Sequence, residues 1–380
     1  MNRFHRRTLP RALVVAVAFA AIAGCSSNDP ASYIASANSY LAKSDYKAAI
    51  IQLKTALQKA PDNGEARFLL AKSLLATGDA AGAETEVRKA IAAHYADDST
   101  NPLLAQAMAA QGKFGKVISE LGEKKLGDPK ARADLDVVLA TAHFAKGDIA
   151  AAKTLADAAL ADAPGNPRTL LLEAQLAARG PGGLAAARGY IDQAVKAAPK
   201  EIDVQLANAE LTLAEGKAGD AQKLLEEAVD AHPKSVPARS ALFSLAFRAG
   251  KIDTAKTQVA KMKEVAPNDL RVVYADALLS TAEGDNTHAQ QEVQRILGAR
   301  PDNLPSLFLA GMLSYRLGAY AAAEDSLRKV IAQVPNDAGT SRLLALTYLR
   351  TGRAQDAINI LAPALASHPN DVMLLRTSGE

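Results

Sequence analysis

Aromatic residues and cysteine are scarce in this sequence. The 380 residues include no tryptophan and one cysteine, and phenylalanine, tyrosine and tryptophan together make up 4% of the chain. A single cysteine excludes an intramolecular disulfide. The low aromatic content, combined with many alanines, differs from the composition of an ordinary single-core globular domain. Small residues favour helices that pack closely instead.

An excess of charge of one sign is also lacking. The chain has 44 lysines and arginines against 41 aspartates and glutamates, but Arg3, Arg6, Arg7 and Arg11 precede Cys25 in a stretch without acids. The remainder has 40 basic and 41 acidic residues. Such a near-neutral chain gives no electrostatic reason to expect a nucleic-acid partner.

Motifs for catalysis or for binding a metal or cofactor are lacking as well. No two of the six histidines stand at a metal-binding or catalytic spacing. The cluster from Gly180 to Gly183 lacks the Gly-Lys-Ser/Thr of a phosphate-binding loop, so a loop insertion is the better interpretation. We predict that the chain is not an enzyme and has no catalytic residue, metal site or cofactor.

The N-terminal segment differs from the rest of the chain. Its arginines precede an apolar run from Ala12 to Ala23, about twelve residues, which is too short to cross a membrane core that needs roughly 20. This pattern predicts a signal peptide over residues 1–24. The run ends in Ile22-Ala23-Gly24-Cys25.

That ending resembles the bacterial lipobox, which implies that Cys25 carries lipid and anchors the mature protein in a membrane facing the periplasm. Residues 25–29 then form a tether. Ser26, in place of the aspartate that favours inner-membrane retention, favours the outer over the inner membrane. The alternative is that Cys25 is a buried or incidental thiol.

Proline recurs along the rest of the chain at an almost constant interval. Five consecutive steps are 34 residues, two are 35, and one of 68 spans a position occupied by Tyr95. Self-similarity at this period indicates stacked helix-turn-helix units. The prolines are Pro61, Pro129, Pro164, Pro199, Pro233, Pro267, Pro301, Pro335 and Pro369.

Small residues keep the same register within the units. At the eighth position stand Ala71, Ala105, Ala140, Ala174, Ala209, Ala277, Gly311 and Ala345. At the fifteenth stand Gly78, Gly112, Gly147, Gly216, Gly250, Gly284, Gly318 and Gly352. At the twentieth stand Ala49, Ala83, Ala152, Ala221, Ala255, Ala289, Ala323 and Ala357.

Each position has a mechanical reason. Small residues at positions 8 and 20 let the two helices of a unit cross closely. Glycine at 15 can adopt the left-handed conformation that ends the first helix, and proline ends the second. Polar residues after the prolines are expected to cap the next helix. The expected caps are Asp62, Asn166, Asn268, Asp302, Asn336 and Asn370.

These residues resemble the tetratricopeptide repeat signature. The resemblance implies an all-α superhelical solenoid of about ten helix-turn-helix repeats over residues 30–371. Residues 372–380 read as the start of an incomplete repeat. We expect either that this is the front part of a longer protein or that the array ends in a frayed unit.

Three departures from the pattern are expected to disturb the array. The unit from Asp98 has Val117 at position 20 and a polar second helix interrupted by glycine, which predicts distortion. An extra residue in Arg179–Gly183 is expected to widen a loop between helices. Phe243 replaces a small residue at position 8, and is expected to push its helix pair apart or to turn outward.

In tetratricopeptide repeats the first helix of each unit lines the concave surface. The resemblance therefore implies a groove for protein or peptide partners, lined by nine residues that we call the groove strip. Its aromatic and arginine side chains suit an extended peptide or an acidic segment. The alternative is that residues such as Phe308, Met312 and Leu346 only pack between repeats. The strip consists of Arg248, Arg271, Tyr274, Phe308, Met312, Tyr315, Arg316, Arg342 and Arg350.

The beginning of the array carries a narrower resemblance. The segments Tyr40–Lys54 and Glu65–Leu70, after the lipobox, resemble tetratricopeptide lipoproteins of the PEP-CTERM/exosortase system. This implies a lipid-anchored scaffold in protein sorting or export linked to exopolysaccharide. The alternatives are an assembly factor for outer-membrane or secretion machinery, and the front part of a multidomain enzyme.

Overall fold

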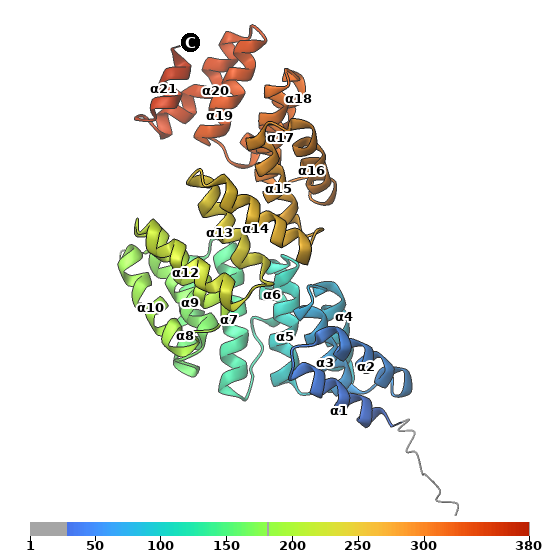
Figure 1. Ribbon diagram of the computed structural model, residues 1–380. Coiled ribbons are helices and arrows are strands. Elements are labelled where there is room, and N and C mark those ends of the chain that lie inside the picture. The colour runs from blue at the N-terminus through green and yellow to red at the C-terminus, as the bar shows by residue number, and fades with distance from the viewer. Residues whose placement is uncertain (1–28, 181, 380) are drawn as a thin grey trace, which may run out of the picture. The chain divides into compact units, whose positions relative to one another are not determined.

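The computed structural model describes residues 29–180 and 182–379, and these form α-helices joined by short turns without any strand (Figure 1). The predicted signal peptide and Cys25 lie outside the described residues. The chain divides into two compact units, Met1–Asp162 and Ala163–Glu380. None of the helices in the described ranges is long and apolar enough to cross a membrane.

Unit 1 contains four helix pairs, and each helix packs on its neighbours along the chain. Its helices are α1 (Pro30–Leu41), α2 (Tyr46–Lys59), α3 (Gly64–Ala76), α4 (Ala80–Ala92), α5 (Asp97–Ala110), α6 (Phe114–Leu121), α7 (Pro129–Ala145) and α8 (Ile149–Asp162).

Unit 2 continues the same alternation. Its helices are α9 (Pro167–Arg179), α10 (Gly183–Ala197), α11 (Ile202–Ala214), α12 (Ala218–Ala231), α13 (Val236–Arg248), α14 (Ile252–Val265), α15 (Leu270–Glu283), α16 (Asn286–Ala299), α17 (Leu304–Arg316), α18 (Tyr320–Gln333), α19 (Ala338–Arg350), α20 (Ala354–Ser367) and α21 (Val372–Ser378). The 21 helices make about ten pairs, so the all-α repeat prediction is confirmed.

Glycine ends the first helix of most pairs, as predicted. The eight glycines expected at position 15 have φ between 70° and 89°, where a side chain would strain the backbone. In the first repeat, formed by α1 and α2, Ser44 occupies this position and has φ of 56°. These left-handed residues reverse the chain between the two helices of a pair.

The helix caps lie one residue later than predicted at five of six turns. Proline and the residue after it occupy the turn, so the extended backbone of a cap first occurs two residues past the proline, as at Asn63. Asn166 was placed correctly because a glycine stands between it and Pro164. The observed caps at the other turns are Asn63, Asp269, Asn303, Asp337 and Asp371.

Small residues lie where the helices of a pair cross. The alanines at positions 8 and 20 are at most 4% exposed. Gly311 shows why size matters, because a Cβ built on it would lie 2.6 Å from Cγ of Leu327 on the facing helix. The predicted role of these positions is confirmed.

A polar contact links consecutive repeats at a fixed offset of 29 residues. Lys113 Nζ donates to Glu84 Oε2 at 2.7 Å, and Arg353 Nη1 donates to Glu324 Oε2 at 2.7 Å. Lys251 Nζ donates to Gln222 Oε1 at 2.6 Å. In each case the donor directly follows the helix-ending glycine and reaches back to the second helix of the preceding repeat. We call this the 29-residue contact.

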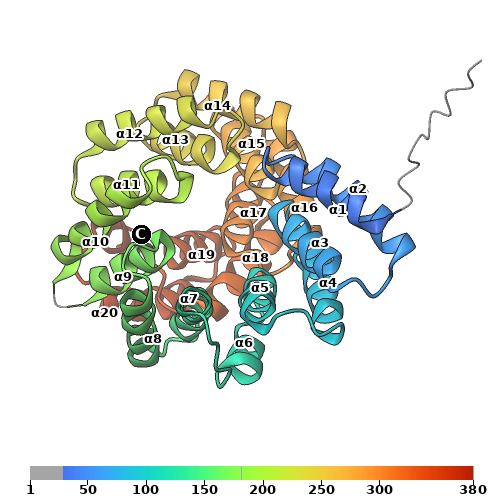
Figure 2. The same cartoon turned by 90° about the horizontal axis from the view of Figure 1, so that it is seen from below.

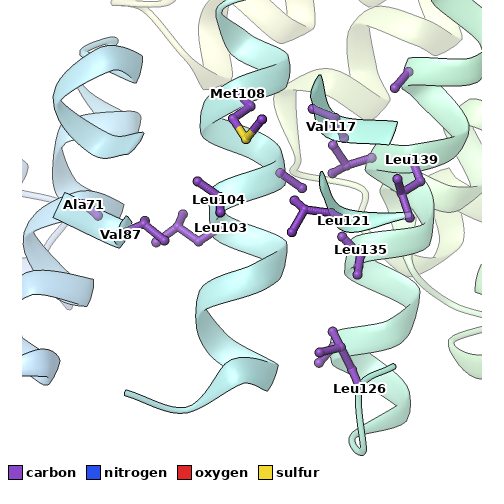
Figure 3. Packing of buried hydrophobic residues seen from close by; sticks show 14 residues of the cluster. Ala71, Val87, Leu103, Leu104, Met108, Val117, Leu121, Leu126, Leu135 and Leu139 are labelled. Carbon is purple, nitrogen blue, oxygen red and sulfur yellow. The ribbon is translucent and has the colours of Figure 1, made fainter. Parts of the chain in front are cut away.

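The repeat that begins near Asp98, formed by α5 and α6, was expected to be distorted, and it does differ from the others. Its second helix, α6, has 8 residues, whereas α18 has 14. Large apolar side chains pack around the short helix, with Leu121 next to Leu135 and Val117 near Leu139 on α7 (Figure 3). The short helix is therefore held by large apolar side chains of α5, α6 and α7.

Two other expectations are wrong: the widened loop, and the outward turn that was one of two alternatives for Phe243. Residues 180–182 separate α9 from α10, the same length as residues 215–217 between α11 and α12. The extra residue lies instead in α10, which has 15 residues. Phe243 does not turn outward. It is 2% exposed, stacks on Phe247 with ring centroids 5.5 Å apart, and packs in the buried cluster that contains Ala255 and Ala275.

Candidate functional site

The groove strip lies on the first helices of four consecutive repeats in unit 2. Helix α15 contacts both α13 and α17, and α17 contacts α19. Figure 2 shows α13 beside α14 and α17 beside α18, so each first helix has its second helix on one side. The nine predicted residues thus lie on neighbouring helices. Some lie near the N-terminal ends of these helices, some in the middle and some at the C-terminal ends.

Three exposed arginines of the strip lie at the C-terminal ends of these helices, and a fourth exposed arginine, Arg271, lies near the N-terminal end of α15. Arg248, Arg316 and Arg350 each end a first helix and are exposed. Arg316 Nη1 donates to the carbonyl oxygen of Thr281 at 3.3 Å, and Arg350 Nε donates to Tyr315 Oη at 3.3 Å. Both bonds join one repeat to the repeat before it, which holds the two guanidinium groups in place.

Tyr315 belongs to the same end of the strip. Its ring lies edge-on to Tyr320 with centroids 5.8 Å apart, and it packs against the buried cluster around Leu344 and Tyr348. A partly buried ring that also holds an arginine gives a fixed, amphipathic surface. Such a surface can contact both apolar groups and carboxylates of a ligand.

The middle of the strip is less accessible. Phe308 and Met312 are partly buried and pack against the core cluster of α18, α19 and α20. Tyr274 packs against the cluster of α15, α16 and α17, and this burial raises the pKa of its phenol. These residues contact the interior between repeats, as the alternative interpretation expected, while each keeps a partly exposed face.

Two arginines of the strip lie near the N-terminal ends of their helices. Arg271 pairs with Asp269, the residue that caps α15, with Nη2 donating to Oδ2 at 2.5 Å. This bond lowers the pKa of the Asp269 carboxyl and fixes Arg271 over its own helix end. Arg342 is partly buried in the second turn of α19. Neither belongs to the cluster formed by Tyr315, Arg316 and Arg350.

The structure brings together one group of residues that the sequence patterns did not predict. Possible ligand atoms of Asp276, His288 and Glu292 all lie within 4.8 Å of one another. His288 and Glu292 are four residues apart on α16, a spacing that could have been noticed in the sequence. Asp276 lies on α15, and only the packing of the two helices places it there.

Comparisons with known proteins agree with the repeat architecture. One tetratricopeptide repeat model matches residues 40–110, 212–279 and 314–376, which together cover more than half of the chain. A second tetratricopeptide repeat model matches residues 137–202 and 281–338. No match was found among curated proteins.

Several solved structures are similar at low sequence identity. The APC/C hetero-tetramer Cut9–Hcn1 is 15% identical, with 93% of this chain and 98% of that chain covered and a TM-score of 0.49. Yeast Tom70 is 15% identical, with 92% and 87% covered and a TM-score of 0.48. A tetratricopeptide repeat protein from Parabacteroides merdae is 14% identical, with 70% and 91% covered and a TM-score of 0.39.

The ranges matched by the two family models contain most of the helix-ending glycines and small crossing residues. The segments matched by the two models follow one another along most of the described chain. This chain belongs to the tetratricopeptide repeat family.

Proposed function

We propose that the chain is a non-enzymatic scaffold that holds protein or peptide partners along the groove strip of unit 2. The family match supports a protein-binding scaffold. The observation that supports this surface is the cluster of Tyr315, Arg316 and Arg350. There, exposed guanidinium groups are fixed by bonds between repeats beside an aromatic ring. Arginine and tyrosine are enriched among residues that dominate binding energy.

A triple variant tests this surface. Tyr315→Ala, Arg316→Ala and Arg350→Ala together should reduce the capture of partners crosslinked in cells. The matched control is Arg328→Ala with Lys329→Ala on α18, which removes two exposed cations of the same unit from a second helix. If the triple variant, with unchanged helix content, captured partners as well as the wild type does, the groove strip would not be the surface that binds them.

The anchoring is proposed on the sequence of the N-terminal segment. Residues 1–24 act as a signal peptide, and the Cys25 thiol is acylated, so the scaffold faces the periplasm from the outer membrane rather than the inner membrane. Growth with an alkyne-labelled fatty acid should label the wild type, and Cys25→Ser should remove the label. Recovery of the labelled protein in inner-membrane fractions would contradict the outer-membrane assignment.

The pathway is proposed on the resemblance of residues 40–54 and 65–70 to lipoproteins of the PEP-CTERM/exosortase system. In this proposal the scaffold serves protein sorting or export linked to exopolysaccharide. Deletion of the gene should then change the surface delivery of sorted proteins or the amount of exopolysaccharide. A defect confined to outer-membrane assembly or secretion would favour the alternative of an assembly factor.

A further inference from the structure

A cluster of charged side chains lies between α15 and α16 inside unit 2. Asp276 comes from α15, and His288 and Glu292 come from one face of α16, because residues four apart are neighbours on a helix surface. Lys263 approaches Asp276 from α14. The groove strip uses none of these four residues.

The geometry of the three possible ligands is close to that of a metal centre. His288 Nε2 lies 3.0 Å from Asp276 Oδ2, and all three ligand atoms are within 4.8 Å of one another. A tetrahedral zinc ion with bonds of about 2.0–2.2 Å places its ligand atoms roughly 3.3–3.6 Å apart. The observed separations, from 3.0 Å to at most 4.8 Å, bracket that spacing.

The carboxylates are not part of a solvated acidic surface. The side chains of Asp276 and Glu292 are 12% and 10% exposed, whereas the His288 side chain is 37% exposed. Buried carboxylates require partners of positive charge. The exposed side of His288 gives an ion access and leaves room for water as a further ligand.

Two basic side chains contact these carboxylates in the structure. Lys263 Nζ donates to Asp276 Oδ2 at 2.8 Å, the same oxygen that His288 contacts. Arg295 Nη1 donates to Glu292 Oε2 at 2.6 Å. A carboxylate accepts several bonds, so Arg295 can remain on Glu292 while the other oxygen binds an ion. Lys263 is half-exposed on a flexible stem and can move away into solvent.

We propose that Asp276, His288 and Glu292 bind a divalent transition metal ion such as Zn²⁺, and that Lys263 gives up Asp276 when the ion binds. One imidazole with two carboxylates suits Zn²⁺ and its transition-metal neighbours better than Mg²⁺ or Ca²⁺, which prefer all-oxygen ligands. The ion would join α15 to α16 and stabilise that helix pair.

The expected effects of two substitutions have opposite signs. His288→Ala removes the only nitrogen ligand and should weaken Zn²⁺ binding by at least about tenfold, since even loss of an outer-shell partner costs that much. Lys263→Met removes the competing ammonium and should strengthen binding by roughly fivefold, the factor expected of a partly exposed ion pair. A purely structural ion-pair network predicts neither effect.

The experiment is a titration of the untagged full chain with Zn²⁺ alone, followed by calorimetry and by thermal unfolding. Zn²⁺ should raise the midpoint of unfolding of the wild type and of Lys263→Met, but not of His288→Ala. The matched control is His143→Ala. His143 Nδ1 also lies 3.1 Å from a carboxylate, Asp148 Oδ2, so this variant removes a histidine–carboxylate pair without touching the site.

Each outcome decides the proposal, provided that circular dichroism shows all variants folded. Loss of binding in His288→Ala together with a gain in Lys263→Met supports the site. Absence of Zn²⁺ binding by both the wild type and Lys263→Met overturns it, and so does equal binding by His288→Ala and the wild type. Preferential binding of Mg²⁺ overturns the assignment to a transition metal. Capture of protein partners does not enter this test, so it stands apart from the proposed scaffold function.

Discussion

The repeat formed by α5 and α6 and the repeat formed by α17 and α18 solve the same packing problem differently. In the second, Gly311 and Ala323 let two long helices cross closely, and α18 has 14 residues. In the first, Ala105 faces Val117 and α6 has only 8 residues, so almost two turns are missing. We call these the regular repeat and the short repeat.

In the short repeat, large buried side chains and ion pairs hold the shortened second helix against its neighbours. Leu104, Met108 and Leu121 are at most 1% exposed in its core. Arg88 on α4 donates through Nη1 to Glu120 on α6 at 2.6 Å, in addition to the 29-residue contact of Lys113 with Glu84. A repeat can therefore lose part of a helix when larger side chains and ion pairs tie the remainder to its neighbours.

The largest expected effect comes from Leu121→Ala in the short repeat. Leu121 is 1% exposed at the end of α6, and its removal should lower the free energy of unfolding by about 2–5 kcal/mol. Urea denaturation measures the loss, and hydrogen exchange should show α6 opening first. Leu327→Ala is the matched variant in α18. If hydrogen exchange showed that Leu327→Ala opens α18 as completely as Leu121→Ala opens α6, the two repeats would not differ in local stability.

Gly311→Ala tests close crossing in the regular repeat. Its Cβ would meet the Leu327 side chain at 2.6 Å, so overpacking should cost about 1–3 kcal/mol in urea denaturation. Gly189→Ala is the control, because Gly189 is exposed in α10 with no atom within 4 Å of an added Cβ. That change should stabilise the helix by about 0.5–1 kcal/mol. If both variants changed the free energy of unfolding in the same direction, Gly311 would not be needed for the close crossing of the two helices.

A third test concerns the left-handed residues that end the first helix in these two repeats and in the others, and it uses one such residue from each of two further repeats. Gly284→Ala should destabilise the chain by about 1 kcal/mol through backbone strain alone, because φ is 85° and no atom lies within 4 Å of the added Cβ. Ser44→Gly should give a gain of similar size, roughly 1 kcal/mol, since Ser44 has φ of 56°. Thermal unfolding with both variants checks the pair, and a loss in Ser44→Gly would refute the strain argument.

The smallest effect is a pH dependence where Glu84 of α4 contacts the short repeat. Burial alone would raise the pKa of Glu84, but hydrogen bonds from Lys113, Gln111 and Arg88 outweigh it and lower the pKa from 4.5 to about 2. A carboxyl with a lowered pKa in the folded state stabilises it above pH 4.5, and this contribution is lost as the pH falls toward 2.

Glu84→Gln provides the measurement. The variant should be less stable than the wild type at neutral pH, and the difference should shrink between pH 4.5 and 2 in urea denaturation. Asp325→Asn on α18, whose partner Lys329 is 55% exposed, serves as the control for a solvated pair. A constant difference across this range would show that Glu84 does not act through its charge.

Much of the fold follows from the sequence because the decisive residues act locally. The helix-ending glycines and crossing alanines recur in register, so their roles could be assigned without knowing the packing. The caps were misplaced because Asp62 and Asn63 are both good caps, and only the turn geometry selects the second. The burial of Phe243 could not be foreseen, since it depends on space left by neighbouring helices.

The sites were less predictable than the fold. The groove strip was identified by position within the repeat, and its binding role stays a prediction. Arg271 could have been recognised from the sequence as a partner of Asp269, two residues away, and therefore as a helix-end contact. The cluster of Asp276, His288 and Glu292 needed the relative rotation of α15 and α16, which periodicity does not specify.

The 29-residue contact has a consequence for how such a chain can change in length. Each donor reaches an acceptor one repeat earlier, so excising a whole period of 34 residues joins residues that already fit one another. Excising one residue fewer would turn every later side chain on the joined helix by about 100°. We therefore expect related sequences to differ by insertions or deletions of whole 34-residue periods. Insertions or deletions one residue longer or shorter should be removed by selection.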